Sequence, residues 1–332
     1  MEFLTWLTDN IEGAQSCIHL NFMEVWLHEE ILDPFYDALY RKKSENPLIP
    51  VTIAISRASA ANPVAAVRFR ELQSLGVNVI WTNEDLLTKY QGNNHRKLVV
   101  IDDKCAIGGV NLHDDLLNAL DYMVVFNNAP ALRETILNSI MNASASDTSS
   151  TPYDIFDLSD EHTDFKLILE NGHADRKSEI IEQAIGLIND AKESVLICGQ
   201  WLPDDRVLFA VINAAKRGVK IELFANSYVT VGGKLYSFAA WFNQFTVKSW
   251  LRGVNIDFTD PDSPVKVTIL PKRIHSKLLI VDESSMILGS DNFVRSGAMF
   301  QTRESSILVR SAKLVGAILK RFRLDIERST AP

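Results

Sequence analysis

Cysteine is scarce in this chain of 332 residues, which contains only Cys17, Cys105 and Cys198, each among apolar neighbours. Three cysteines in a chain of this length exclude a disulfide scaffold by composition, and the absence of a CxxC pair argues against a zinc knuckle or a thiol redox motif. We therefore expect three buried free thiols.

Long apolar runs are also missing. No stretch of 18 uncharged apolar residues occurs, so no membrane span is predicted. The acidic, amphipathic start lacks the basic and apolar regions of a signal peptide. These absences favour a cytoplasmic protein, and peripheral contact with a membrane surface stays open.

Basic residues are in the minority, with 34 Lys and Arg against 42 Asp and Glu and a net charge of −8. Non-specific nucleic-acid binding needs a basic face, so this composition argues against it. Residues 1–163 carry 11 basic and 23 acidic side chains, whereas residues 164–332 carry 23 and 19. The positive second half suits an anionic substrate, although a mixed solvated surface would give the same numbers.

An internal repeat organises the chain. The octets HRKLVVID at 95–102 and HSKLLIVD at 275–282 stand 180 residues apart, and each leads into a short Gly- and Asn-containing segment, GGVN at 108–111 and GSDN at 289–292. The length suffices for about two domains of roughly 150 residues. We predict one domain duplicated in tandem.

The segment between the copies is rich in Ser, Thr and Asp, has one Pro, and lacks Lys and Arg. Such a composition is typical of a linker, because it offers no continuous apolar face. The predicted division is a first domain at 1–141, a linker at 142–163 and a second domain at 164–332.

Each copy predicts helices that alternate with strands, which indicates an α/β fold with a mixed sheet flanked by helices. In the first copy we expect helices at 3–15, 29–43 and 63–75 and strands at 16–22, 51–55, 77–81, 98–102, 105–107 and 122–126. In the second copy we expect helices at 178–192, 204–217 and 235–252 and strands at 194–199, 219–224, 254–258, 278–282, 286–288 and 306–309. A further helix closes each copy. The two copies are expected to pack about a pseudo-two-fold axis.

The octets suggest phosphoryl chemistry. Histidine and lysine two apart in a strand point to the same face, so His95 lies beside Lys97 and His275 beside Lys277. Two lysines that converge with two asparagines can bind an oxyanion such as a phosphoryl group. One imidazole can then attack phosphorus while the other protonates the leaving oxygen. This chemistry requires neither a metal nor a cofactor, and no metal-ligand motif is found.

The paired H-x-K-x4-D motifs, each followed by Gly-Gly or Gly-Ser and Asn, resemble the phospholipase D superfamily over essentially the whole chain. The NHRK opening at 94–97 and the Arg-Gly-Val helix end look most similar to the branch of cardiolipin synthases and bacterial phosphatidyltransferases. The resemblance implies tandem phospholipase D-like domains.

The resemblance also implies a role for each motif residue. It makes His95 and His275 catalytic, with His95 as nucleophile and His275 as acid. Acidic residues further along the chain would orient the imidazole of the opposite copy, Glu304 that of His95 and Asp121 that of His275. The resemblance assigns phosphate binding to five further positions: Lys97, Lys277, Asn111, Asn292 and Ser290. Lys97, Lys277 and the motif aspartates Asp102 and Asp282 are counted with the catalytic set, although such aspartates are usually structural.

The two copies differ in spacing. Asn111 follows Asp102 by nine residues, whereas Asn292 follows Asp282 by ten, and Gly109 stands where the second copy has Ser290. The shorter turn leaves open whether Asn111 contacts the phosphate.

The segment at 234–251 is the most aromatic of the chain. Leu235, Phe238, Phe242 and Phe245 recur at helical spacing, which favours packing of this face in the core. The alternative is that Trp241, Phe242 and Trp250 contact an acyl chain or a membrane surface.

The leading hypothesis is a metal-independent phosphodiesterase or phosphatidyltransferase that acts on phospholipids through a phosphohistidine. The alternatives are a nuclease of the same superfamily, which the acidic first half disfavours, and a phosphate- or lipid-binding scaffold without activity. The expected partner is a phospholipid or another phosphodiester substrate. One chain already supplies both motifs, so a monomer suffices.

Overall fold

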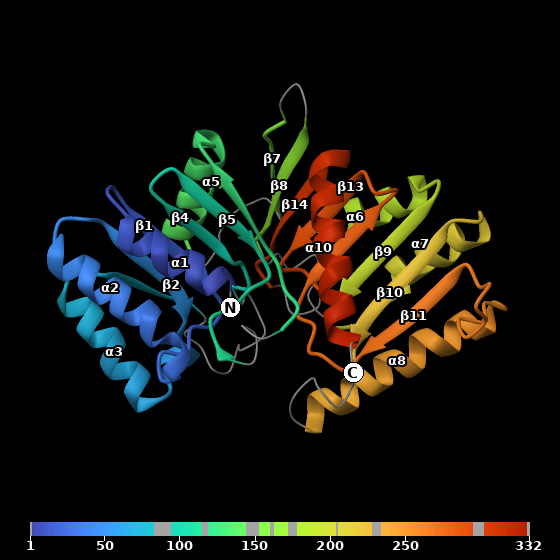
Figure 1. Ribbon diagram of the computed structural model, residues 1–332, viewed down its shortest axis with the longest axis horizontal. Coiled ribbons are helices and arrows are strands. Elements are labelled where there is room, and N and C mark those ends of the chain that lie inside the picture. Colours follow the sequence, from blue (N-terminus) through green and yellow to red (C-terminus); the bar gives the residue numbers. More distant parts are fainter. Residues whose placement is uncertain are drawn as a thin grey trace.

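The computed structural model describes residues 2–82, 94–114, 119–143, 153–159, 163–171, 178–203, 205–227, 234–294 and 302–330. Two mixed sheets lie side by side, with helices on their faces (Figure 1). The first sheet has the order β3-β2-β1-β4-β5-β6. Its strands are β1 (Ile18–Phe22), β2 (Val51–Ser56), β3 (Asn78–Thr82), β4 (Leu98–Ile101), β5 (Lys104–Gly108) and β6 (Met123–Asn127).

The second sheet repeats this order as β11-β10-β9-β12-β13-β14 and adds β8 and β7 at the β14 edge. Its strands are β7 (Tyr153–Asp157), β8 (Asp164–Glu170), β9 (Ser194–Gly199), β10 (Lys220–Asn226), β11 (Val265–Leu270), β12 (Lys277–Val281), β13 (Ser285–Gly289) and β14 (Ser305–Arg310). In both sheets three strands run parallel and the octet strand pairs antiparallel with the first of them. This repetition confirms the predicted tandem duplication.

Apolar helix faces cover the sheets and create three cores. The helices are α1 (Glu2–Gly13), α2 (Asp33–Glu45), α3 (Pro63–Ser74), α5 (Pro130–Met141), α6 (Glu179–Asp190), α7 (Asp205–Lys216), α8 (Lys234–Gly253) and α10 (Ala312–Thr330), with short 3-10 turns at Glu30–Leu32 and Arg57–Ala60. One core unites α1, α2 and α3 with the first sheet, and another unites α6, α7 and part of α8 with the second. The third contains residues of both octet strands, α5 and α10. This shared core joins the halves, so the octets are brought together by packing.

The strand predicted at 254–258 is wrong, because the edge strand of the second sheet is β11. Residues 254–256 instead end α8 in a left-handed cap: Asn255 has φ 61°, and the amides of Asn255 and Ile256 donate to the carbonyls of Arg252 and Leu251. A residue in this conformation cannot continue into a strand.

The segment expected to be a linker contains β7, which pairs with β8. Its sequence YDIFD contains Tyr, Ile and Phe, which are residue types common in strands. The surrounding Ser, Thr and Asp residues hide these three residues, and β8 was missed with them. The domain boundaries proposed from the sequence stay a prediction.

Candidate active site

The two octet histidines are held at the junction of the halves. His95 donates its backbone N–H to the carbonyl of Arg303 at 2.9 Å, and His275 donates to that of Leu120 at 3.0 Å. Isolated parallel bridges join Asn94 to Arg303 and Leu120 to Ile274. Each histidine is therefore positioned by backbone of the opposite half.

Each imidazole is paired with a carboxylate from the opposite half. Nδ1 of His95 lies 2.9 Å from Oε2 of Glu304, and Nδ1 of His275 lies 2.7 Å from Oδ2 of Asp121. The structure thus brings together the residues that the resemblance pairs. A carboxylate on Nδ1 favours the tautomer with its proton there, which leaves the lone pair on Nε2.

Two lysines lie completely buried beside the histidines. Lys97 and Lys277 have an exposed fraction of 0%, and each ammonium donates to the backbone carbonyl of the histidine two residues earlier. Burial lowers the pKa of Lys97 to about 7 and that of Lys277 to about 8, although Glu304 and Asp121 act in the opposite direction. Such buried donors gain from an anion that compensates their charge.

The imidazoles also lie in each other's field. Burial lowers the pKa of His95, and Lys97 adds to this against the opposing carboxylate of Glu304. Burial lowers the pKa of His275 well below its ordinary value, with further contributions from Lys277, Lys97 and His95. Both rings are therefore neutral at pH 7 before substrate binds.

The two carboxylates differ in acid strength. Burial by itself would raise the pKa of Glu304, but the charge and hydrogen bond of His95, together with Lys97 and the Ser290 hydroxyl, hold it well below its usual range. Burial raises the pKa of Asp121 to about 6 against Lys277, the Tyr122 N–H and Lys97. Glu304, beside His95, therefore stays ionised to a lower pH than Asp121, beside His275.

Ser290 acts on Glu304 in this structure. Its hydroxyl donates to Oε2 of Glu304 and accepts the N–H of Ser305 at 2.9 Å. Thr302 donates to Oε1 of Glu304 at 2.9 Å. The resemblance implies that Ser290 contacts the phosphate. In the structure its hydroxyl orients the Glu304 carboxylate.

Gly109 makes room for Asp121 in the corresponding place. A Cβ built on Gly109 would lie 2.3 Å from Oδ1 of Asp121. The first half therefore combines the shorter side chain of Asp121 with Gly109. The second half combines the longer side chain of Glu304 with Ser290.

We expect Gly109→Ser to lower kcat/KM by about 10²-fold, because the added side chain displaces Asp121 from His275. Gly186→Ser is the matched control, since a Cβ at Gly186 meets nothing within 4 Å. Steady-state kinetics would test this, and an unchanged kcat/KM in Gly109→Ser would show that His275 does not need Asp121 in place.

The spacing difference between the copies lies far from the site. The β4–β5 hairpin pairs Ile101 with Lys104, whereas the β12–β13 hairpin pairs Val281 with Ser285. The turn of the first hairpin is therefore one residue shorter than the turn of the second, which accounts for the difference in spacing. Asn111 and Asn292 both stand three residues beyond the glycine that ends their strand.

The asparagines differ in their contacts. Oδ1 of Asn111 accepts the Glu24 N–H at 3.4 Å. The buried Oδ1 of Asn292 has no hydrogen-bond partner among the described residues. An unsatisfied buried amide group at this place can serve a bound ligand.

Asp102 and Asp282 do not join the catalytic cluster. Each follows its lysine by five residues, which along a strand is about 16 Å. Asp102 accepts the N–H groups of Gln15, Ser16 and Cys17 at 2.7–3.1 Å. Asp282 accepts those of the matching residues, Lys192, Glu193 and Ser194, at 2.8–2.9 Å. Both aspartates secure the connection from a helix to the first strand of their half, which corrects their place in the predicted catalytic set.

Asp282→Asn should reduce the free energy of unfolding by about 1–2 kcal/mol and leave the kcat of folded protein unchanged, because hydrogen bonds to a charged acceptor are lost. Burial by itself would raise the pKa of Asp282, but the hydrogen bonds from the three amide groups lower it below its ordinary value in the folded protein. The difference is therefore full at neutral pH and shrinks as the pH falls through the carboxyl range. Urea unfolding at several pH values measures it, with the exposed neighbour Glu283→Gln as control.

Sequence reasoning missed Arg96. Its buried guanidinium donates to the carbonyls of Glu304 (3.2 Å) and Glu170 (2.6 Å), and to the side chains of Ser139 and Asn171. It thereby connects α5, β8 and the backbone of Glu304. The motif offers no sign of this role, because the position between His and Lys is variable and holds Ser276 in the second copy.

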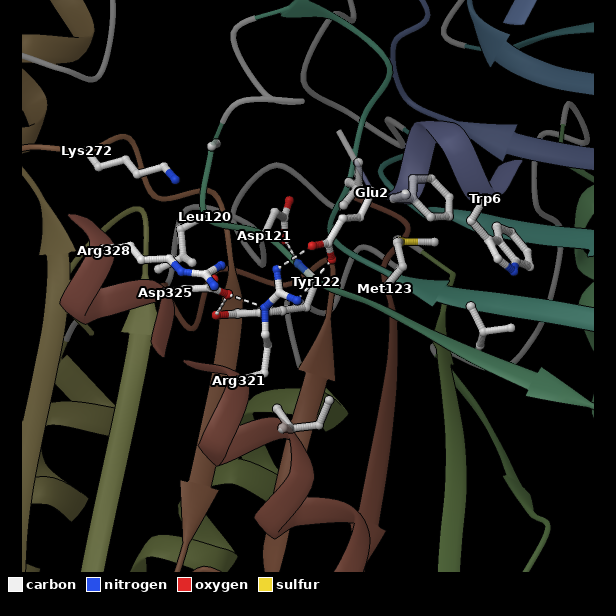
Figure 2. A pocket seen from close by; sticks show the side chains of 15 residues that line it. Glu2, Trp6, Leu120, Asp121, Tyr122, Met123, Lys272, Arg321, Asp325 and Arg328 are labelled. Atoms are coloured by element: carbon white, nitrogen blue, oxygen red, sulfur yellow. Dashed lines mark hydrogen bonds and ion pairs between the residues drawn. The ribbon is translucent and has the colours of Figure 1, made fainter. Parts of the chain in front are cut away.

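A pocket of about 580 Å³ lies beside Asp121, between α1 and α10 (Figure 2). Arg321 bonds both Glu2 and Asp325 there, so the first and last helices meet next to a catalytic-site carboxylate. None of the described residues that line this pocket is a histidine, so the pocket lies apart from the paired imidazoles.

Within the described residues, no group of three or more His, Cys, Asp or Glu side chains is arranged to hold a metal ion. None of the helices among them is long and apolar enough to cross a membrane.

Comparison with known proteins gives consistent results. Residues 184–326 match the family described as "Cardiolipin synthase, PLD-like domain". Over 98% of its length the chain is 22% identical to a cardiolipin synthase of Clostridium perfringens, of which it covers 68%. It is 28% identical to a phospholipase D of Rickettsia prowazekii over 41% of this chain and 57% of that protein. The crystal structure of a phosphatidylserine synthase of Haemophilus influenzae matches with a TM-score of 0.79 at 15% identity, over 98% of this chain and 84% of the other.

Proposed function

Since this chain is an enzyme of the phospholipase D superfamily, we propose that it cleaves a phospholipid phosphodiester and passes the phosphatidyl group from a histidine to water or an alcohol. The observation that carries the proposal is the reciprocal pairing of His95 with Glu304 and of His275 with Asp121. The names of the relatives, which include a cardiolipin synthase and a phospholipase D, support a phospholipid as substrate.

The first step forms a bond between Nε2 of His95 and phosphorus. The bond from phosphorus to the leaving alcohol breaks, its electron pair stays with the alcohol oxygen, and protonated His275 gives that oxygen a proton. Lys97 and Lys277 stabilise the charge on the other phosphoryl oxygens.

The second step reverses these roles. Neutral His275 takes the proton of water or of an acceptor alcohol, whose oxygen attacks phosphorus. The phosphorus–nitrogen bond breaks and its electron pair returns to His95. Hydrolysis and transfer differ only in the acceptor.

The assignment of His95 as nucleophile rests on Glu304. That carboxylate is ionised and fixed by Ser290 and Thr302, so it both orients the ring and stabilises the positive charge that develops on it. Among the described residues no serine bonds Asp121, and burial raises its pKa, which suits the histidine that changes protonation state.

Charge balance explains how His275 acquires its proton. The positive charges of Lys97 and Lys277 are opposed by the negative charges of Glu304 and Asp121. A phosphodiester adds one negative charge, which raises the pKa of the nearby imidazole and favours its protonation. Substrate and proton therefore bind together.

The pH dependence of kcat/KM should be bell-shaped. The acid limb lies below pH 6.5, because burial lowers the pKa of His95 and protonation removes its lone pair. The alkaline limb lies near pH 7–8, where Lys97 and Lys277 lose their protons in the free enzyme. Initial rates at low substrate from pH 5 to 9 measure both limbs, and a flat profile would contradict this account.

The decisive assay incubates the full chain with phosphatidylglycerol vesicles in EDTA, with and without added glycerol. We expect headgroup release or exchange that persists in the chelator and that His95→Ala abolishes. Turnover of single-stranded oligonucleotides without lipid turnover would overturn the lipid assignment in favour of a nuclease. Phospholipid binding without any turnover would indicate a scaffold.

A further inference from the structure

The outer face of α8 carries an uncovered row of aromatic rings. Phe238, Trp241, Phe242 and Phe245 expose 62%, 46%, 56% and 57% of their surface. Trp241 stacks on Phe245 with ring centroids 5.6 Å apart and lies 5.9 Å from Phe238. The core packing expected for Phe238, Phe242 and Phe245 is therefore wrong, and the side chain of Leu235 lies outside the described residues.

The rings occupy the side of α8 that faces away from the protein. Their spacing of three and four residues places them on one helix face. The opposite face is buried and consists of Ala240, Gln244, Val247 and Leu251. This buried face already anchors the helix, so the rings are not needed for the fold.

The buried face also connects α8 to the active site. Nε2 of Gln244 donates to the carbonyl of Asn226 at 2.7 Å. The side chain of Asn226 in turn binds both the N–H and the carbonyl of Ile274, the residue before His275. The buried face of α8 is therefore connected through Asn226 to the residue that precedes His275.

Charge along α8 favours an anionic partner. Its 20 residues contain Lys234, Lys248 and Arg252 and no Asp or Glu, in a chain with a net charge of −8. Arg252 continues the exposed face at its C-terminal end. The acidic residues Asp257, Asp260 and Asp262 follow that end in the sequence.

We propose that this aromatic face docks on the surface of a bilayer containing anionic phospholipid. Interfacial helices combine Trp and Phe on one face with Lys and Arg, and the rings enter the boundary between headgroups and acyl chains. Figure 1 shows α8 along the β11 side of the second sheet, and Gln244 connects it to Asn226 at the end of β10. Docking through α8 would bring the lipid surface to this side of the second sheet. The inference rests on the proposed function, because it supplies the substrate at the site.

Flotation of the full chain with vesicles tests the surface directly. Wild-type protein should bind vesicles of phosphatidylglycerol and phosphatidylcholine more strongly than vesicles of phosphatidylcholine alone. Phe242→Ser with Phe245→Ser should weaken binding by roughly tenfold for each ring removed. The matched control is Leu324→Ser on α10, which removes a side chain that is 42% exposed and should leave binding unchanged.

Activity on two forms of substrate separates this inference from the proposed function. The ring variants should lose turnover of vesicle lipid in proportion to binding and keep turnover of a short-chain monomeric phosphatidylglycerol. Thermal unfolding should be unchanged, because the rings are exposed. Turnover of the monomeric lipid by wild type without vesicle binding would overturn the docking surface and leave the function standing.

A second copy of the chain is the other possible occupant of this face. Gel filtration of wild type as a dimer, with a shift to monomer in the ring variants and no vesicle binding, would reassign the face and overturn the inference. Vesicle binding that depends on the rings, without turnover of either substrate, would support the surface and overturn the proposed function.

Discussion

His95→Ala should abolish both formation of the covalent intermediate and turnover of every phosphodiester, whereas His275→Ala should abolish turnover but keep the first step where the leaving group needs no proton. The expected loss is roughly 10⁴-fold or more, as for other catalytic groups that act as a unit. The difference follows from the roles proposed above: His95 forms the bond to phosphorus, and His275 moves protons.

A phosphatidyl nitrophenyl ester separates the two variants, because nitrophenolate leaves without a proton. His275→Ala should release about one equivalent of nitrophenol per enzyme and then stop, with phosphatidyl groups retained on His95. His95→Ala should show no burst. The exposed His28→Ala serves as control and should behave as wild type.

Detection of the retained group completes this test. A phosphohistidine survives base and is released by acid, so quenching at high pH followed by mass analysis locates it on the peptide that contains residue 95. A burst in His95→Ala and none in His275→Ala would exchange the two roles.

Glu304→Gln should lower kcat/KM by about 10²–10⁴-fold and shift the acid limb of its pH profile downward. The amide can keep the geometry: its oxygen can accept from His95 and Ser290, while its nitrogen donates to Thr302. What disappears is the negative charge. Because that charge raises the pKa of His95 against the effect of burial, its removal lowers the pKa of His95 further.

Thr302→Val is the control for this variant, since it removes one hydrogen bond to Glu304 and keeps the charge. Its effect should stay within about tenfold, with the acid limb unmoved. Full activity and an unshifted profile in Glu304→Gln would reduce Glu304 to a packing role.

The sequence predicted most of the fold because the helical and strand periodicities are strong and occur twice. Its errors arose where tertiary contacts decide. Ile256 and Phe258 have strand-like spacing, yet Asn255 adopts a left-handed conformation that only the structure reveals. Phe238 and Phe242 look like core residues because helical periodicity shows which residues share a face and is silent on which face is covered.

At the site, the motif located His95, Lys97 and their counterparts because those residues are fixed in spacing by the strand that carries them. The residues that hold these side chains in place through hydrogen bonds could not be predicted in the same way. Arg96 bonds the backbone of Glu304, which is more than a hundred residues away in the sequence. Thr302 bonds the Glu304 carboxylate, whose partner His95 lies in the other half. The pattern located Ser290 but did not predict its hydrogen bond to Glu304, since spacing does not show which way a hydroxyl points. Its contact with the phosphate stays a prediction.

Covalent linkage of the halves has a consequence for chemistry. If two separate identical subunits formed this centre, every imidazole would receive the same carboxylate and the same small residue beside it. In the fused chain the two environments can diverge independently, and they have done so, with Glu and Ser on one side and Asp and Gly on the other. Division of labour between chemically identical rings is thus open to the fused chain and closed to a symmetric homodimer.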